Sequence, residues 1–470
     1  MADPNAAIIQ GVPTEIVQSG LLQRVFHDTL IATFIYRAEA TPEKAAANIG
    51  ASLTMTRPGP IAVNVTPVTG KDISPATYQF EQWNVFYDQY GNSVDTDMLT
   101  SELTLASTYL RNAKMLGINA AETLNHLARN ALYTAYLAGN TCMTAAATSA
   151  TAIHVAAING FTTVTVLVSG KPLPVPVSST NKLPIQINPG SSPTSVNVIN
   201  AVPDDSSVPL GPGTLYLDAA VTASARAAVY ASSRSRVLRP NAANSVDGIT
   251  SSSTLTSAML FTALKYLQTL NVPPCVDGTY HVHLQPDAIA QLVSNDANFR
   301  QLYQSLPDTT VFRDGALGQL FGMRFYQDTQ NPTSSNSGTL ISTGSGESKF
   351  ATEINGEVIN DGGVQIARVL ILGGQGLYEH WIDESKLLTE AGYTGKVGEF
   401  VVVNNGISLM TDRIRMILRA PLDRKQQVVS SSWTWSGGWA VPSDVLGMNS
   451  NGSQFRRAIV LEHASSSANF

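Results

Sequence analysis

The sequence predicts an α+β fold that carries a small inserted β-domain, and three observations support this. Apolar and polar residues alternate over residues 51–92, which is typical of strands. Apolar residues then recur at helical spacing from Ser101 to Gly139. From residue 141 to 225 charged residues are scarce and prolines separate short β-branched runs, which favours a small β-sandwich or barrel.

Length and charge limit the class of protein. A chain of 470 residues exceeds the size of a single hydrophobic core, so several domains are expected. Charged residues make up 14%, against the usual value of about 25%. So low a share of charged residues favours a protein that buries much of its surface against other subunits. The net charge of −6 argues against a protein whose main task is to neutralise nucleic-acid phosphates.

Several segment types are missing from the sequence. Two cysteines, Cys142 and Cys275, are too few for a disulfide framework. The N-terminus has neither the basic start nor the apolar stretch of a signal peptide, and no window holds about 18 consecutive apolar residues. We therefore expect a soluble protein of a reducing compartment, without a membrane-spanning helix.

The alternating region before the helix predicts a long two-stranded ribbon. Pro58, Pro60, Pro67 and Pro75 restrict its strands to edges, because proline cannot donate to a sheet ladder. The stretch "TPVTGKD" suits the turn at its tip. An isolated two-stranded ribbon is only marginally stable, so this one needs a partner, and another subunit is expected.

The helix from Ser101 to Gly139 would be about 58 Å long if continuous. Thr100 or Ser101 caps its start, and Gly139-Asn140 supplies its stop. Gly117 permits a bend in the middle. Further elements are expected as a helix over 257–272, a strand over 281–284 followed by a helix that opens at Pro286, and strands over "GQLFGMRFYQD", "GVQIARVLILGG" and "KVGEFVVVNN". "SLMTDRIRMILRAP" alternates and has the length of a long strand or a helix, of which the strand is favoured.

Basic residues gather in two places at strand-like spacing. We expect them on solvated or subunit-facing sides of strands; they are Arg226, Arg234, Arg236 and Arg239, then Arg413, Arg415, Arg419, Arg424 and Lys425.

His281 and His283 are the strongest candidates for chemistry. Two residues apart on a strand, their side chains point to the same face and could share a metal ion. The nearest third ligand in sequence is Asp287, beyond Pro286. The alternative is a strand-to-helix joint with hydrogen-bonded or exposed histidines, which is the more common origin of this spacing.

Other motifs fail on inspection. "GTLISTGSGESK" has Ser348 where a phosphate-binding loop needs glycine, and "GGQG" at Gly373–Gly376 lacks the third glycine of a dinucleotide fingerprint. The neighbours Glu379 and His380 could form an acid–base pair, but nothing marks them further. No catalytic site is therefore predicted.

Taken in order, the segments resemble a tailed-bacteriophage major capsid protein of the Hong Kong 97 type. The most telling stretch is "YHVHLQPDAIAQLVSNDANFRQLY" followed by "DGALGQLFGMRFYQDTQNP", in which Gly315, Gly318 and Gly322 match the glycine pattern of podovirus-like capsid proteins. "LILGGQGLYEHW" resembles the axial-domain strand that follows, and "RIRMILRAPLDRKQQVVSSSWTW" the returning peripheral strand. The order of the segments, and no single motif, carries the resemblance.

The resemblance implies a division of the chain: an N-terminal arm over 1–50, an extended β-hairpin loop over 51–92, a spine helix of the peripheral domain over 93–140, an inserted β-sandwich or barrel over 141–225, a peripheral domain over 226–279, an axial domain over 280–395, and a return to the peripheral domain with the C-terminal tail over 396–470.

The function implied by the resemblance is structural, without catalysis or a cofactor. Such proteins self-assemble into hexamers and pentamers that form the icosahedral head shell around packaged double-stranded DNA, after assembly in the host cytoplasm. A portal protein and scaffolding or decoration proteins are the implied partners. The ribbon residues expected to contact a neighbouring subunit are Arg57, Lys71, Tyr78, Trp83 and Phe86. Some relatives crosslink a loop lysine to another subunit's asparagine, and Lys71 is the only lysine of this loop.

Two other classes stay open at this point. A metal-dependent β-barrel enzyme would use His281, His283 and a carboxylate. A β-rich adhesion or carbohydrate-binding protein would use Trp433, Trp435 and Trp439. The missing third ligand counts against the first, and the missing signal peptide against the second.

Overall fold

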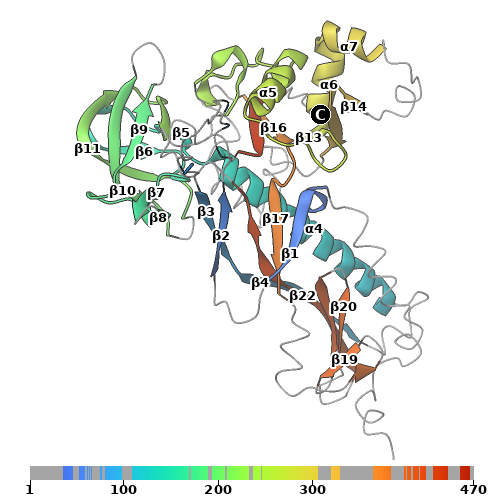
Figure 1. The fold of residues 1–470 in the computed structure, drawn as a ribbon. Helices are drawn as coiled ribbons and strands as arrows, with labels where there is room; N and C mark the ends of the chain where they lie inside the picture. Colours follow the sequence, from blue (N-terminus) through green and yellow to red (C-terminus); the bar gives the residue numbers. More distant parts are fainter. Residues whose placement is uncertain are drawn as a thin grey trace, which may run out of the picture. The chain divides into compact units, whose positions relative to one another are not determined.

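The computed structural model describes residues 35–45, 52–58, 61, 63, 65, 75–76, 80–97, 108–168, 171–188, 193–206, 209–231, 237–244, 246–304, 319–328, 364–382, 396–397, 400–403, 406–411, 413–419, 427–442 and 456–465. Among these residues many strands accompany few helices, as the predicted α+β class requires (Figure 1). The chain divides into two compact units. The first draws on 1–53, 84–129 and 377–440, and the second on 54–83, 130–376 and 441–470.

The first unit is built on an eight-stranded sheet. Its strands lie in the order β1 (Ala40–Lys44), β17 (Leu377–Trp381), β22 (Val428–Ala440), β21 (Ile414–Arg419), β20 (Gly406–Thr411), β19 (Phe400–Val403) and β18 (Lys396–Val397), and β4 (Asp88–Asp97) pairs with β22. The short 3-10 turn η2 (Arg37–Glu39) leads into β1, which runs parallel to β17. β4 was not predicted as one strand: its first residues fall in the predicted ribbon, and residues 93–97 fall in the implied spine segment. Its polar sequence has little intrinsic strand preference, and its pairing partner β22 lies more than 300 residues away.

Three segments that were predicted to be single strands are hairpins. "KVGEFVVVNN" forms β18 and β19, in which Val397 pairs with Phe400. "SLMTDRIRMILRAP" forms β20 and β21, in which Thr411 pairs with Ile414 across a two-residue turn. "GQLFGMRFYQD" forms β14 (Gln319–Leu320) and β15 (Met323–Gln327) in the second unit, with Phe321 and Gly322 in the turn at φ of 52° and 77°. A two-residue turn preserves the alternation of apolar residues, so the pattern alone does not reveal it.

The predicted long helix is present as α4 (Thr108–Leu137). Residues 101–107 of the prediction lie outside the described residues, and residues 93–97 of the implied spine segment belong to β4. The helix runs unbroken through Gly117 and stops before Gly139, whose φ of 73° is the left-handed conformation expected of a helix-ending glycine.

Asparagines join α4 to its neighbours in the first unit. Asn112 donates to Thr96 Oγ1 at 2.7 Å. Asn119 Oδ1 accepts hydrogen bonds from Asn92 Nδ2 and from the indole Nε1 of Trp433. Further along, Asn125 Oδ1 accepts from the backbone amides of residues 36 and 37. These three positions on one helix form a polar seam that fixes the register of α4.

The inserted β-domain of the second unit is a six-stranded barrel. Its strands lie in the order β5 (Asn140–Cys142), β12 (Ala228–Ala231), β9 (Leu183–Ile187), β10 (Thr194–Pro203), β11 (Gly213–Ala223) and β6 (Ala147–Val155). A bridge between Met143 and Val155 joins the first strand to the last and closes the ring. Every second residue of β9 (Leu183, Ile185 and Ile187) is buried in its core. The hairpin of β7 (Thr163–Val168) and β8 (Lys171–Pro176) forms a separate two-stranded sheet.

The rest of the second unit centres on a five-stranded sheet. Its order is β14, β15, β13 (Tyr280–Leu284), β16 (Ile366–Leu372) and β23 (Ala458–Ala464). The helices α5 (Ser257–Thr269), α6 (Pro286–Asn295) and α7 (Ala297–Gln304) contribute apolar side chains to the same core. Two 3-10 turns, η3 (Pro240–Ala242) and η4 (Val246–Gly248), precede α5. Pro286 occupies the first turn of α6, as predicted.

Sheet membership cuts across the implied domain boundaries. β17 lies before residue 395 and β22 after residue 396, yet they pair in the first unit. β23 lies in the C-terminal part, yet it pairs with β16 of the five-stranded sheet. α5 lies before residue 279 and packs into the core of that sheet. Strand pairing between distant segments therefore sets the membership of each sheet.

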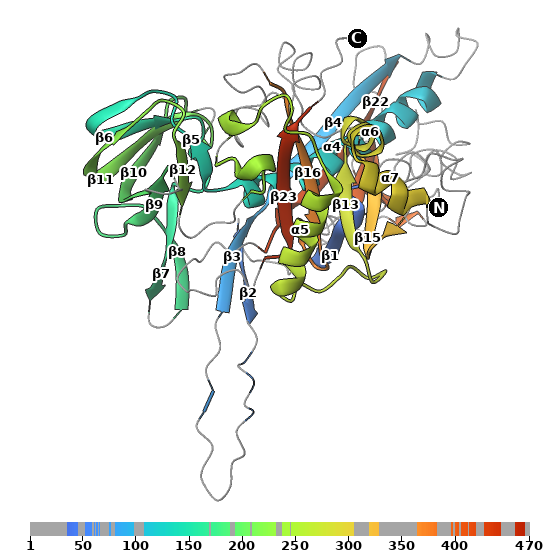
Figure 2. The ribbon, with the colours of Figure 1, turned by 90° about the horizontal axis from the view of Figure 1, so that it is seen from above.

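The predicted ribbon begins as the pair of β2 (Ser52–Pro58) and β3 (Phe80–Phe86), which run side by side in Figure 2. Its predicted tip, "TPVTGKD", lies outside the described residues.

Candidate functional site

His281 and His283 both lie on β13 and both contact Tyr326 of the neighbouring strand β15. The ring centroids of His281 and Tyr326 are 5.0 Å apart, and the ring of His283 stacks on that of Tyr326 at 5.6 Å. His283 is fully buried, whereas His281 Nε2 lies 3.0 Å from Asp277 Oδ2 at the partly exposed end of the strand. The two histidines thus share a face, as predicted, and an aromatic ring occupies the place beside them.

The loop before β13 anchors His281 through Asp277. Its carboxylate also accepts hydrogen bonds from Thr279 and from Arg324 Nη1. Desolvation acts to raise the pKa of Asp277, but these hydrogen bonds outweigh it and hold the pKa well below the usual value. The group is therefore a charged structural brace for the strand-to-helix joint.

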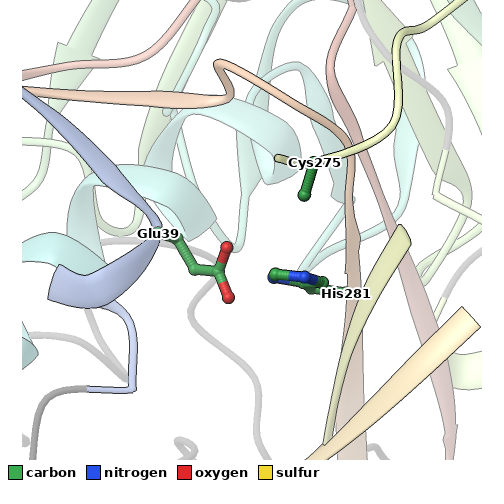
Figure 3. Close-up of side chains that lie close together, drawn as sticks. All are labelled: Glu39, Cys275 and His281. Atoms are coloured by element: carbon green, nitrogen blue, oxygen red, sulfur yellow. The ribbon is translucent and has the colours of Figure 1, made fainter. Parts of the chain in front are cut away.

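The expected third metal ligand, Asp287, points to other partners. Its Oδ2 accepts from Gln291 Nε2 at 3.1 Å and from Ser465 Oγ at 2.9 Å. Figure 3 shows Cys275, which precedes β13, and His281, which lies on β13. Glu39 in the same view belongs to the first unit. Within the second unit, no further His, Cys, Asp or Glu of the described residues completes a three-ligand group with those two. The geometry therefore gives no support to the alternative in which His281, His283 and Asp287 share a metal ion.

Two of the three tryptophans of β22 are buried in the first unit, and the third, Trp439, is half-buried. Trp433 and Trp435 are each 1% exposed, and Trp435 stacks on Trp439 with ring centroids 5.6 Å apart. A carbohydrate-binding platform needs exposed aromatic faces, which Trp433 and Trp435 do not offer.

Glu379, which the sequence marks only weakly, lies at the centre of a buried ionic cluster in the first unit. Its two oxygens bind Arg37 Nη2 at 2.8 Å and Arg413 Nη1 at 3.2 Å. The neighbouring His380 is buried on the same strand, with Nε2 3.6 Å from Glu43. Two arginines balance the charge of Glu379, and His380 contacts a different carboxylate. Glu379 and His380 are therefore not arranged as an acid and a base for proton transfer, and Glu379 serves as a structural ion-pair partner.

The second unit contains a matching cluster around Glu462. Arg239 Nη2 and Arg368 Nε approach its two oxygens at 2.8 and 3.1 Å, and all three side chains are buried. Burial alone would raise the pKa of Glu462, but the two guanidinium groups lower it. Arg239 was predicted to line a solvated or subunit-facing strand side; it is instead an internal ion-pair partner. Sequence spacing cannot reveal this, because Glu462 lies 223 positions away.

The glycines of "GGQG" allow close packing of neighbouring segments. A Cβ atom on Gly373 would lie 2.5 Å from Val272 Cγ1, and the amide of Gly374 donates to Pro273 O at 2.8 Å. Neighbouring atoms thus leave no room for a side chain at Gly373.

Of the five residues predicted to contact another subunit, Phe86 is the one whose side chain is described, and it is 67% exposed at the end of β3. Arg57 and Trp83 lie on β2 and β3, but their side chains are outside the description, as are Lys71 and Tyr78 altogether. Ile61, Val63 and Val65, which belong to the predicted alternation but not to the predicted contact residues, expose 55%, 87% and 86% of their surface. Because they occupy alternate positions in the sequence, we call these three residues the ribbon stripe.

Comparison of the fold with solved structures found similarity to bacteriophage capsids. No family model matches the sequence, and no curated protein matches it. Similar solved structures include the capsid of Ralstonia phage GP4, with 12% identity, coverage of 92% of this chain and 88% of that chain, and a TM-score of 0.44. The capsid asymmetric unit of cyanophage Pam1 has 9% identity, coverage of 89% and 86%, and a TM-score of 0.46. For the capsid of cyanophage P-SCSP1u the values are 11%, 92%, 89% and 0.45. Each of these three solved structures is a phage capsid.

Proposed function

We propose that this protein is a major capsid protein that self-assembles into hexamers and pentamers, and that these tile an icosahedral head shell around packaged double-stranded DNA. Its role is structural and involves no catalysis. The order of parts supports the proposal: a strand-bearing arm, a two-stranded ribbon, a 30-residue helix, a barrel and two further sheets.

The single observation that carries the proposal is the ribbon stripe. Ile61, Val63 and Val65 occupy alternate positions and are largely exposed in one copy of the chain. Isolated exposed apolar residues are ordinary, but three at alternate positions of a predicted ribbon, which would be marginally stable by itself, indicate a contact surface. Association of many copies buries such a stripe repeatedly, so weak individual contacts add up to a stable shell.

The contacts that we assign to the ribbon include Phe86 together with Arg57, Lys71, Tyr78 and Trp83. Phe86 is supported by its exposure. The other four follow from their position in the ribbon segment, and a crosslink from Lys71 to an asparagine of another subunit is part of the same proposal.

The remaining partners follow from the shell. A portal protein and scaffolding or decoration proteins would complete a head, and the barrel would brace adjacent subunits or stand on the outer surface. Contact with DNA would use dispersed arginines and lysines on the inner face without base readout, to which a net charge of −6 is no obstacle. Among the described residues, no helix is long and apolar enough to cross a membrane. The proposed location is the virion, after assembly in the host cytoplasm.

Negative-stain electron microscopy of the purified chain tests this function. Five- and six-membered rings, tubes or closed shells are expected. Particles of a single compact monomer at every protein and salt concentration would contradict it. The Val63→Lys variant places a charge in the ribbon stripe, and its micrographs should contain a larger share of small, unassembled particles. Val202→Lys on the barrel, where the valine is 41% exposed, is the matched control and should assemble normally.

A further inference from the structure

The hairpin of β7 and β8 offers one open edge and one blocked edge. Residues Val164 and Val166 of β7 pair with Val175 and Leu173 of β8. The prolines of β8 pair with the intervening residues and have no N–H to give, so the valines must supply the ladder hydrogen bonds. The amide of Val177 donates to the carbonyl of Thr162 at 3.0 Å, which continues the same alternation beyond the strands.

This alternation of hydrogen-bonded and non-bonded pairs decides which backbone groups face outward at each edge of the hairpin. Pro172, Pro174 and Pro176 turn carbonyls but no donors outward, which blocks the β8 edge against a further strand. On β7 the backbone groups of Thr165 and Leu167 point outward instead, and both N–H and C=O are available there. No described strand pairs with this edge, because the two-stranded sheet ends at β7 (Figure 2). The hairpin is therefore built to accept a strand on one side only.

The ribbon stripe has the chemistry of the missing strand. Ile61, Val63 and Val65 lie in "IAVNVT", a β-branched stretch without proline between Pro60 and Pro67. Their period of two matches the half-buried Val164, Val166 and Val175 on one face of the hairpin. Because 55–87% of the stripe is exposed, the copy that owns it leaves it uncovered. A second copy is the occupant that these exposures favour.

We infer that the segment around Ile61, Val63 and Val65 of one copy adds as a strand to the β7 edge of another copy. Its stripe then lies beside Val164 and Val166 of that hairpin, of which Val164 also packs against the barrel core. This inference rests on the proposed self-assembly and specifies one contact within it. The blocked β8 edge limits each hairpin to a single added strand, so the contact joins copies without growing into an open-ended sheet.

Crosslinking between two differently tagged populations tests the contact. One carries Val63→Cys and the other Val166→Cys, each in a Cys275→Ser background, since Cys142 is buried and Cys275 is partly exposed. A short bismaleimide should join them into a product of about 100 kDa, twice the 50.0 kDa chain. Val202→Cys, on an exposed barrel position, should give none in place of Val166→Cys.

The edge itself is tested by Thr165→Pro, combined with the same cysteines. It removes one outward N–H and leaves the inner ladder intact. We expect the yield of the crosslink to fall about tenfold, which corresponds to a loss of about 1.4 kcal/mol. Pro174→Thr restores a donor on the opposite edge and should leave the yield unchanged. An equal yield from the Thr165→Pro chain would overturn the inference.

Microscopy of the same samples separates this contact from the proposed function. Assembled particles without the Val63–Val166 crosslink would refute the contact and leave the capsid proposal standing. A crosslink in samples without rings or shells would support the contact and refute the capsid proposal. Absence of both would refute both.

Discussion

Arg37 and Glu379 are 342 positions apart in the chain, yet Nη2 of the arginine lies 2.8 Å from Oε1 of the glutamate. Both side chains are almost completely buried, and Arg413 neutralises the other carboxylate oxygen at 3.2 Å. The pair ties the turn η2, and with it strand β1, to β17 in the first unit. A buried charge that loses a partner is costly, so this contact holds the N-terminal part of the unit in place.

Arg37→Ala should therefore destabilise the first unit by about 3–5 kcal/mol, the usual cost of breaking a buried ion pair. Urea unfolding followed by tryptophan fluorescence would measure the loss. Lys182→Ala is the matched control, since Lys182 is 44% exposed in its ion pair with Asp218 and such pairs contribute about 0–1 kcal/mol. Equal losses in the two variants would contradict the bracing role of Arg37.

Mild acid should weaken the second unit through His463. Burial lowers the pKa of this histidine from 6.5 to about 4, although the Ala464 carbonyl and Asp287 act in the opposite direction. Between those pH values the unfolded chain binds a proton that the folded chain does not. Stability is thus complete above pH 6.5 and falls as the pH drops toward 4, by about 3 kcal/mol at most.

Thermal unfolding at a series of pH values measures this effect. His463→Phe should flatten the decline between pH 6.5 and 4, whereas His154→Gln, at an exposed position of the barrel, should not. An unchanged slope in the His463→Phe chain would show that other groups dominate.

The polar seam on α4 should be sensitive at Asn119. Asn119→Ala removes the acceptor of the buried Trp433 indole N–H, and leaving such a donor unsatisfied costs about 1–3 kcal/mol. Glu122→Ala, at an exposed position of the same helix, is the control and should change little. Loss of stability together with a changed tryptophan emission is expected. A neutral Asn119→Ala variant would argue against the seam.

Alanine substitutions at Gly160 and Gly278 distinguish the cost of backbone strain from the cost of steric crowding. Both have φ near 80° (82° and 78°), so alanine at either site pays for a left-handed conformation, about 1–2 kcal/mol. A Cβ on Gly160 would also collide with Gly139 and Ala138, whereas nothing lies within 4 Å of one on Gly278. Gly160→Ala should thus lower the melting temperature clearly more than Gly278→Ala. Equal shifts would show that conformation alone decides.

Local patterns in the sequence predicted the local structure well. Helical spacing located α4, Pro286 marked the start of α6, and alternation located β2, β3 and β13. Such features depend on residues close together in the chain, so a short window contains the information.

Long-range features escaped prediction. β4 becomes a strand because β22 pairs with it, and Glu462 is ionised inside the protein because Arg239 and Arg368 arrive from distant segments. The ribbon stripe was within reach of the sequence, since Ile61, Val63 and Val65 alternate visibly, but their exposure became evident only from the structure. The strand edge at β7 likewise depends on the register that pairs prolines with its outward-facing residues.

Sedimentation velocity of the wild-type chain over a concentration series tests the central claim of self-assembly most directly. The capsid proposal predicts discrete fast species with masses near five and six chains or of whole shells, and a smaller share of them when Val63 is replaced by lysine. One species of 50.0 kDa across the series would contradict it.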